Sequence, residues 1–88
     1  MEKLQLEISN WQEKTFPKAD ASSTFHHLVN EIVELGKALD KNAGIEGELA
    51  DCQHLLFGIA SKCGVNLYEA TQKKFAVNKK RSHIKTQR

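Results

Sequence analysis

Two pairs of carboxylate side chains stand at helical spacing on neighbouring stretches of the sequence. Glu31 and Glu34 are three residues apart, and so are Glu48 and Asp51. Side chains at this spacing lie next to each other on an α-helix. Glu48 also falls inside an apolar helical stripe, which comprises Ile45, Glu48, Cys52, Leu55 and Ile59. A carboxylate in that stripe loses solvation and is repelled by its neighbour, so its presence requires an explanation.

The four carboxylates can meet if the two helices that carry them pack as an antiparallel hairpin. Like charges gathered at a half-buried site attract a multivalent cation, and hard oxygen ligands of this kind suit Mg²⁺ or, as a second choice, Mn²⁺. A single ExxE pair is also common on a solvated helix face. Both pairs border an apolar face, which favours a metal site, but the residues alone leave both interpretations open.

The periodicity of the apolar residues predicts four helices and no strand. Pro17 ends the first helix, residues 20–23 offer N-cap side chains for the second, and residues 42–44 form a short turn. Gly64 is suited to a left-handed cap, and Asn66 can cap the fourth helix. The helices are expected at residues 3–14, 23–41, 45–63 and from the cap at residue 66 through residue 78.

Length and composition indicate a single small globular domain. The chain has 88 residues, of which 40% are hydrophobic and 27% are charged. No segment approaches the roughly 18 apolar residues of a membrane span, and the first residues lack the features of a signal peptide. We therefore expect a cytoplasmic protein without a membrane partner. Cys52 and Cys63 are too far apart along one predicted helix to form a disulfide, and both are expected to be buried, reduced thiols.

The carboxylate motif also carries a family resemblance. Residues 30–34 (NEIVE), followed after thirteen residues by residues 48–51 (ELAD), resemble the EExxE…ExxD signature of the MazG-like, all-α nucleoside triphosphate pyrophosphatases. The resemblance extends over residues 4–81. It implies an all-α, four-helix MazG-like bundle in residues 1–82, followed by a basic tail in residues 83–88 that has little to bury and is expected to be disordered.

The resemblance implies a specific reaction. This family hydrolyses nucleoside triphosphates between the α and β phosphates and releases a monophosphate and pyrophosphate. Asn30 departs from the motif, where the family has glutamate. Its amide supplies an oxygen but no negative charge. A site with weak activity, or none, is therefore the alternative to an active enzyme. One or two Mg²⁺ ions would be held, and the attacking water polarised, by the four matching carboxylates: Glu31, Glu34, Glu48 and Asp51.

Substrate-binding residues are expected on the first and fourth helices. Lys74 and Asn78 are four residues apart on one helix face, which suits contacts to phosphate or sugar, and Arg81 continues the same series. Trp11, the only tryptophan, can stack on a nucleobase, and Gln12 can form a hydrogen bond with the base edge. Trp11 can equally pack the first helix onto the core.

The small size of the chain favours a homodimer or a dimer of dimers. Val33 and Phe57 lie outside the main apolar stripe, and we expect a partner subunit to bury them. In the resembling family, neighbouring subunits commonly complete the active site. The implied role is removal of non-canonical or excess (deoxy)nucleoside triphosphates, and phosphoribosyl-ATP pyrophosphatase activity stays open as a related possibility.

The charge distribution suggests an alternative function. Residues 73–88 carry seven Lys or Arg residues and no acid, whereas residues 1–72 have a formal charge of −5. Such a basic end can contact nucleic acid, so a small helical nucleic-acid-binding or adaptor module is the alternative. That function leaves the carboxylates unexplained, and aromatic residues are not interleaved with the basic ones. Nucleic acid is therefore not the expected partner.

Overall fold

Four α-helices make up the computed structural model, which describes residues 2–84. No strand occurs among these residues, so the all-α prediction is confirmed. The fourth helix continues past the domain boundary expected at residue 82, and the remainder of the expected tail, residues 85–88, lies outside the described part of the chain. The helices are α1 (Glu2–Thr15), α2 (Ala21–Lys41), α3 (Ile45–Lys62) and α4 (Leu67–Ile84).

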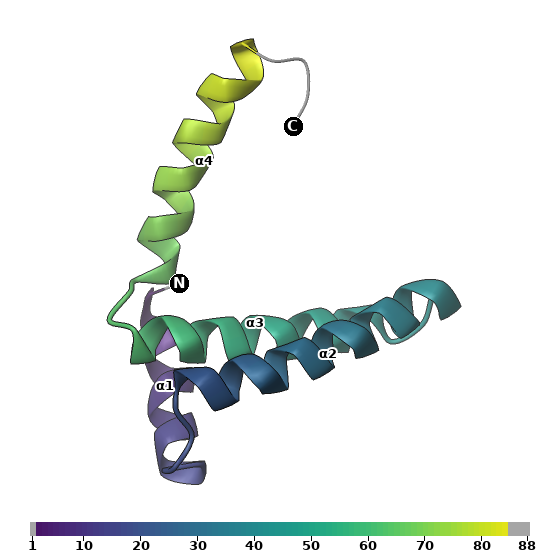
Figure 1. The fold of residues 1–88 in the computed structure, drawn as a ribbon, viewed down its shortest axis with the longest axis vertical. Coiled ribbons are helices and arrows are strands. Elements are labelled where there is room, and N and C mark those ends of the chain that lie inside the picture. The colour runs from purple at the N-terminus through teal and green to yellow at the C-terminus, as the bar shows by residue number, and fades with distance from the viewer. Residues whose placement is uncertain (1, 85–88) are drawn as a thin grey trace.

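The helices α2 and α3 form an antiparallel hairpin (Figure 1). In the turn, Asn42 has φ 55° and Gly44 has φ 73°, left-handed values that these two residue types tolerate best. At the start of α2, the backbone N–H of Ser23 donates to Asp20 Oδ1 (2.8 Å), and the backbone N–H of Asp20 donates to Ser23 Oγ (3.0 Å). This capping box confirms the N-cap predicted within residues 20–23.

The hairpin buries a narrow apolar seam. Leu28 of α2 packs with Cys52 and Leu55 of α3, and Leu35 and Ile59 lie partly buried against them. The α3 stripe predicted from the sequence is therefore confirmed. The periodicity of the sequence predicts a buried face on the second helix as well, but four of its six apolar residues remain exposed in the single chain, namely Phe25, Val29, Ile32 and Leu39.

Helix α1 crosses the end of the hairpin at which α2 begins and α3 ends (Figure 1). Because α3 packs against both α1 and α2, Phe57 is only 2% exposed, and the prediction that Phe57 needs a partner subunit is wrong. Val33 stays exposed. Cys63 is also exposed, because α3 ends at Lys62 and Cys63 forms its C-cap, so the prediction of a buried thiol holds only for Cys52.

A buried glutamine fixes the junction between α3 and α4. Gln5 of α1 donates from Nε2 to Ser61 Oγ (3.1 Å) and to the Val65 carbonyl oxygen (2.9 Å). Its Oε1 accepts a hydrogen bond from the backbone N–H of Leu67 (3.0 Å), the first residue of α4. Gly64 takes the predicted left-handed conformation, with φ 70°. Together these contacts set the direction in which α4 leaves the hairpin.

Helix α4 extends away from the hairpin and does not lie along it (Figure 1). The single chain therefore does not close the four-helix bundle that the sequence predicted. The physical reason is that the apolar residues of α4 are few and scattered, and Tyr68, Phe75 and Val77 remain exposed. Within residues 2–84, no helix is both long enough and apolar enough to cross a bilayer.

Candidate active site

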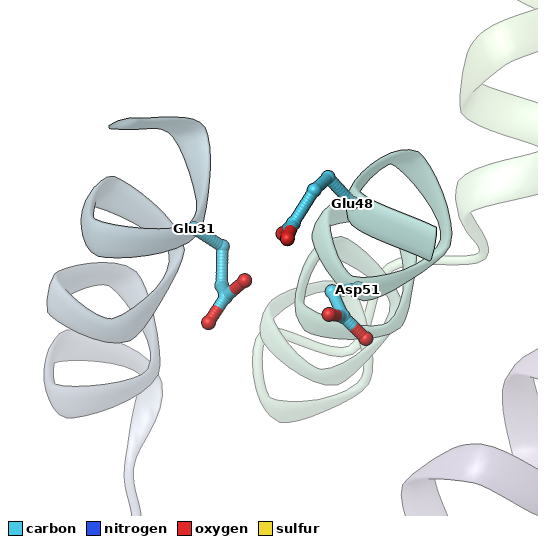
Figure 2. A group of neighbouring side chains, drawn as sticks. All are labelled: Glu31, Glu48 and Asp51. Atoms are coloured by element: carbon cyan, nitrogen blue, oxygen red, sulfur yellow. The ribbon is translucent and has the colours of Figure 1, made fainter. Parts of the chain in front are cut away.

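Three carboxylates from the two helices of the hairpin converge. Figure 2 shows Glu31 on α2 facing Glu48 on α3, with Asp51 beside Glu48 on the same helix. One oxygen from each residue lies within 4.8 Å of the other two. Glu31 and Glu48 are half-buried, whereas Asp51 is exposed. The convergence expected from the sequence is thus observed for three of the four residues.

Glu48 is the carboxylate that the fold leaves least satisfied. Its Oε1 is buried and has no hydrogen-bond partner among the described residues. Burial raises the pKa of Glu48 above its ordinary value of 4.5, and the adjoining carboxylate of Glu31 raises it further, as do the charges of Asp51 and Glu34. The donor set fits a hard divalent cation, whose charge would offset both the repulsion and the lost solvation.

Glu34 lies close enough to raise the pKa of Glu48, but its carboxylate has another partner. Its Oε2 is 3.3 Å from Nζ of Lys37, one turn further along α2. The single chain does not bring Glu34 into the three-residue cluster, and its role as a metal ligand stays a prediction. Asn30, which occupies the position of the first glutamate in the motif, is exposed.

A cavity of about 390 Å³ adjoins the carboxylates. Glu31 and Asp51 line it from the hairpin, and Trp11 and Phe16 line it from α1 and the residue that follows α1. The rings of Trp11 and Phe16 meet edge to face, with centroids 5.9 Å apart and an interplanar angle of 82°. The cavity has the size of a small-molecule site, and it combines an aromatic wall with an acidic one.

Comparison with known proteins connects this geometry to a family. Residues 4–88 match the family model for dATP/dGTP pyrophosphohydrolases. The chain belongs to this family. The resemblance to MazG-like pyrophosphatases is thereby confirmed. The chain is also 35% identical over 74 residues to a dATP/dGTP diphosphohydrolase of Salmonella phage PMBT28, an alignment covering 84% of this chain and 24% of that protein. The chain thus spans about a quarter of the relative's length. No solved structure matches it.

Two predicted substrate residues of this dATP/dGTP pyrophosphohydrolase family member lie at the cavity. Trp11 is 58% exposed, so in the single chain it does not serve to pack α1 onto the core. Gln12 is half-buried, and its Nε2 donates to the carbonyl oxygen of His54 (3.2 Å). Both side chains line the cavity that also contains Glu31 and Asp51. Contact with a nucleotide stays a prediction for both residues.

The other three predicted substrate residues lie on α4. Lys74 and Asn78 border a shallow groove beside Phe75, and Arg81 is exposed one turn further on. Because α4 extends away from the hairpin, the single chain does not bring these side chains to the carboxylates. Their assignment to phosphate or sugar contacts stays a prediction.

Sequence reasoning missed two histidines at the cavity. His54 is exposed, and it lines the cavity together with His27. Nε2 of His27 is 3.6 Å from Oε2 of Glu31. Helical spacing carried a usable signal for both, because His27 precedes Glu31 by four residues and His54 follows Asp51 by three. What the sequence did not show is which side of the hairpin α1 borders.

Proposed function

We propose that the protein is a Mg²⁺-dependent pyrophosphohydrolase that converts deoxynucleoside triphosphates to monophosphates and pyrophosphate, with dATP and dGTP as the first substrates to test. The observation that carries this proposal is the convergence of Glu31, Glu48 and Asp51 around a buried, unpartnered oxygen. Family membership supports the reaction, and the name of the phage relative supports the substrate class.

The carboxylates would hold the metal and help to activate water. Glu31 and Glu48 face each other across the two helices, and Asp51 is the most accessible of the three. When bound, Mg²⁺ offsets the charge of the phosphate oxygens and acts as a Lewis acid toward the reacting phosphate. A carboxylate oxygen not used in metal binding can accept the proton of the attacking water. Mn²⁺ suits the same ligands.

The cavity would hold a nucleoside next to these carboxylates. The exposed face of Trp11 offers a stacking surface for a base, at the α1 wall of the cavity. The triphosphate of a base stacked there would extend toward Glu31 and Asp51, which line the same cavity. Lys62 also lines the cavity, and it supplies a cation for a phosphate chain that carries several negative charges.

A homo-oligomer would complete the site. Lys74, Asn78 and Arg81 have no route to the carboxylates of their own chain, because α4 extends away from the hairpin. Exposed apolar side chains on α2 and α4, such as Ile32 and Phe75, support burial between subunits. In the cell, the activity would serve to control the nucleotide pool by removing particular triphosphates.

Pyrophosphate release tests this proposal. A panel of the four common NTPs and the four common dNTPs is incubated with Mg²⁺ and the full chain, and the monophosphate product is identified. We expect turnover of dATP or dGTP, with Glu48→Gln and Asp51→Asn at least about 100-fold slower, since loss of an outer-shell group alone costs 10- to 100-fold.

Glu46→Gln is the matched control for this panel. It removes an exposed carboxylate in the first turn of α3, outside the three-residue cluster. We expect it to retain the wild-type rate. Equal rates for wild type and Glu48→Gln would contradict the role given to the cluster, and release of inorganic phosphate without pyrophosphate would contradict cleavage between the α and β phosphates.

A further inference from the structure

The contact between α1 and α3 is unusually close at one glycine. Gly58 is buried about one turn before the end of α3, and the side-chain amide of Gln12 lies against it. A Cβ added to Gly58 would lie 3.2 Å from Cδ and 3.3 Å from Nε2 of Gln12, and closer still to Oε1. These separations leave no room for any side chain at position 58 while the Gln12 amide keeps its place.

Gly58 differs in this respect from the other glycines inside helices. Glycine in a helix interior costs stability relative to alanine, so its presence there needs a packing reason. At Gly36 in α2 and Gly47 in α3, an added Cβ would meet no atom within 4 Å. Of the helical glycines in the part of the chain described, Gly58 is thus the one whose missing side chain makes space for another residue.

The space is occupied by a residue with a defined hydrogen bond. Nε2 of Gln12 donates to the carbonyl oxygen of His54 on α3, at 3.2 Å. A carbonyl can only accept, so this bond fixes which end of the amide is the nitrogen and holds the side chain in one orientation. Gln12 and His54 both line the cavity, and so does Trp11, the residue immediately before Gln12 on α1. The amide therefore attaches the aromatic wall of the cavity to the helix that carries Asp51.

We propose that Gly58 is a positioning residue of the nucleotide pocket: by lacking a Cβ it lets the Gln12 amide dock on α3, and this contact sets the distance between the Trp11 wall and the carboxylates. The nature of the ligand in this inference rests on the proposed function, whereas the contact between Gly58 and Gln12 does not. Gly58 itself contacts no substrate in this scheme and acts through Gln12.

Gly58→Ala tests the proposal without preventing folding. The added methyl group collides with the far end of a flexible side chain and not with backbone, so Gln12 can swing out of the way. Loss of the hydrogen bond to His54 is then offset by the better helix propensity of alanine. We expect a melting temperature close to that of wild type. Gly36→Ala is the matched control, because it adds the same methyl group to a helix in open space.

Four readouts separate positioning from stability. In Gly58→Ala, we expect the Gln12 side-chain amide resonances to move to the position of a free glutamine and the emission of Trp11, the only tryptophan, to change. Quenching of that emission by dAMP or dGMP should require about fivefold more nucleotide, the factor expected from one hydrogen bond. KM for the active deoxynucleotide should rise by a similar factor, with kcat within about twofold of wild type.

A double-mutant cycle with Gln12→Ala completes the test. If Gly58 acts through Gln12, the effects of the two substitutions on nucleotide binding should be non-additive, since either one removes the same contact. Unchanged amide resonances, or unchanged nucleotide binding and KM in Gly58→Ala, would overturn the proposal. If no variant, wild type included, hydrolyses any nucleotide, the proposed function fails, whereas the resonances and the quenching by dAMP still decide whether Gly58 positions the pocket.

Discussion

Glu48 combines burial and negative charge at a position where a leucine would pack more favourably. This feature was predictable, because residue type and helical spacing are both local properties of the sequence. Helical spacing also puts His27 near Glu31 and His54 near Asp51, but the cavity that both histidines line was not predictable, because it depends on how α1 lies across the hairpin. Sequence periodicity identifies which side chains share a helix face, but it does not show which other helix covers that face.

Asp20 provides a prediction at the scale of single residues. The backbone N–H and hydroxyl of Ser23 hold the pKa of Asp20 below its ordinary value of 3.8. The ionised cap therefore stabilises the fold above pH 3.8, and that contribution is lost as the pH falls through the lowered pKa. We expect the melting temperature of the wild type to fall over this acidic range. Circular dichroism at a series of pH values measures it.

Asp20→Asn is the control for the pH series. Asparagine keeps a side-chain oxygen that can cap α2, but it does not titrate in this range. The variant should lose less stability than the wild type between pH 3.8 and the lowered pKa. An identical acid dependence in both proteins would show that the cap of α2 does not contribute to it.

At the scale of the helices, the bounds were easier to predict than the arrangement. Capping residues such as Asp20, Asn42 and Gly64 mark the helix ends in the sequence, and the structure places these ends within two residues of the prediction for α1, α2 and α3. The direction of α4 was not predictable. It depends on Gln5, a residue 56 to 62 positions away from its three partners, and nothing in the polar sequence of α4 indicates a buried face.

Gln5→Ala should weaken the junction between α3 and α4. The substitution leaves the Leu67 N–H and the Val65 carbonyl without their side-chain partner in a partly buried place. We expect the free energy of unfolding to fall by about 1–3 kcal/mol, as measured by urea denaturation. Hydrogen exchange at the Leu67 amide should accelerate as well.

Gln53→Ala is the matched control for Gln5, because it removes an exposed glutamine from α3. Its effect on the free energy of unfolding should stay within about 0.5 kcal/mol. If both variants lose the same stability, the three hydrogen bonds of Gln5 are not what holds the junction together.

At the scale of the whole molecule, the single chain exposes more large apolar side chains than it buries. Small domains have limited capacity to bury their own apolar surface, so association is the expected remedy. The sequence indicated this need, but of the two residues it named only Val33 is exposed, because Phe57 is already buried within the single chain. The surface that remains includes α4, where Phe75 is 60% exposed.

Self-association can be tested by sedimentation. We expect the wild type to sediment as a species larger than the 9.9 kDa monomer. Phe75→Glu should shift the distribution toward the monomer, because it places a charge on an apolar patch that a partner would bury. Gln72→Glu adds a charge to the same helix at an exposed polar position and should leave the distribution unchanged. A monomeric wild type would contradict completion of the site by a neighbouring subunit.

Calorimetric titration of Mn²⁺ into the metal-free 88-residue chain tests the metal site most directly. The three converging carboxylates and the unpartnered Oε1 of Glu48 predict saturable binding to the wild type and to Glu46→Gln, with binding lost or severely weakened in Glu48→Gln. Binding to Glu48→Gln that equals binding to the wild type, or no binding to either, would contradict the claim that these carboxylates form the metal site of a pyrophosphohydrolase.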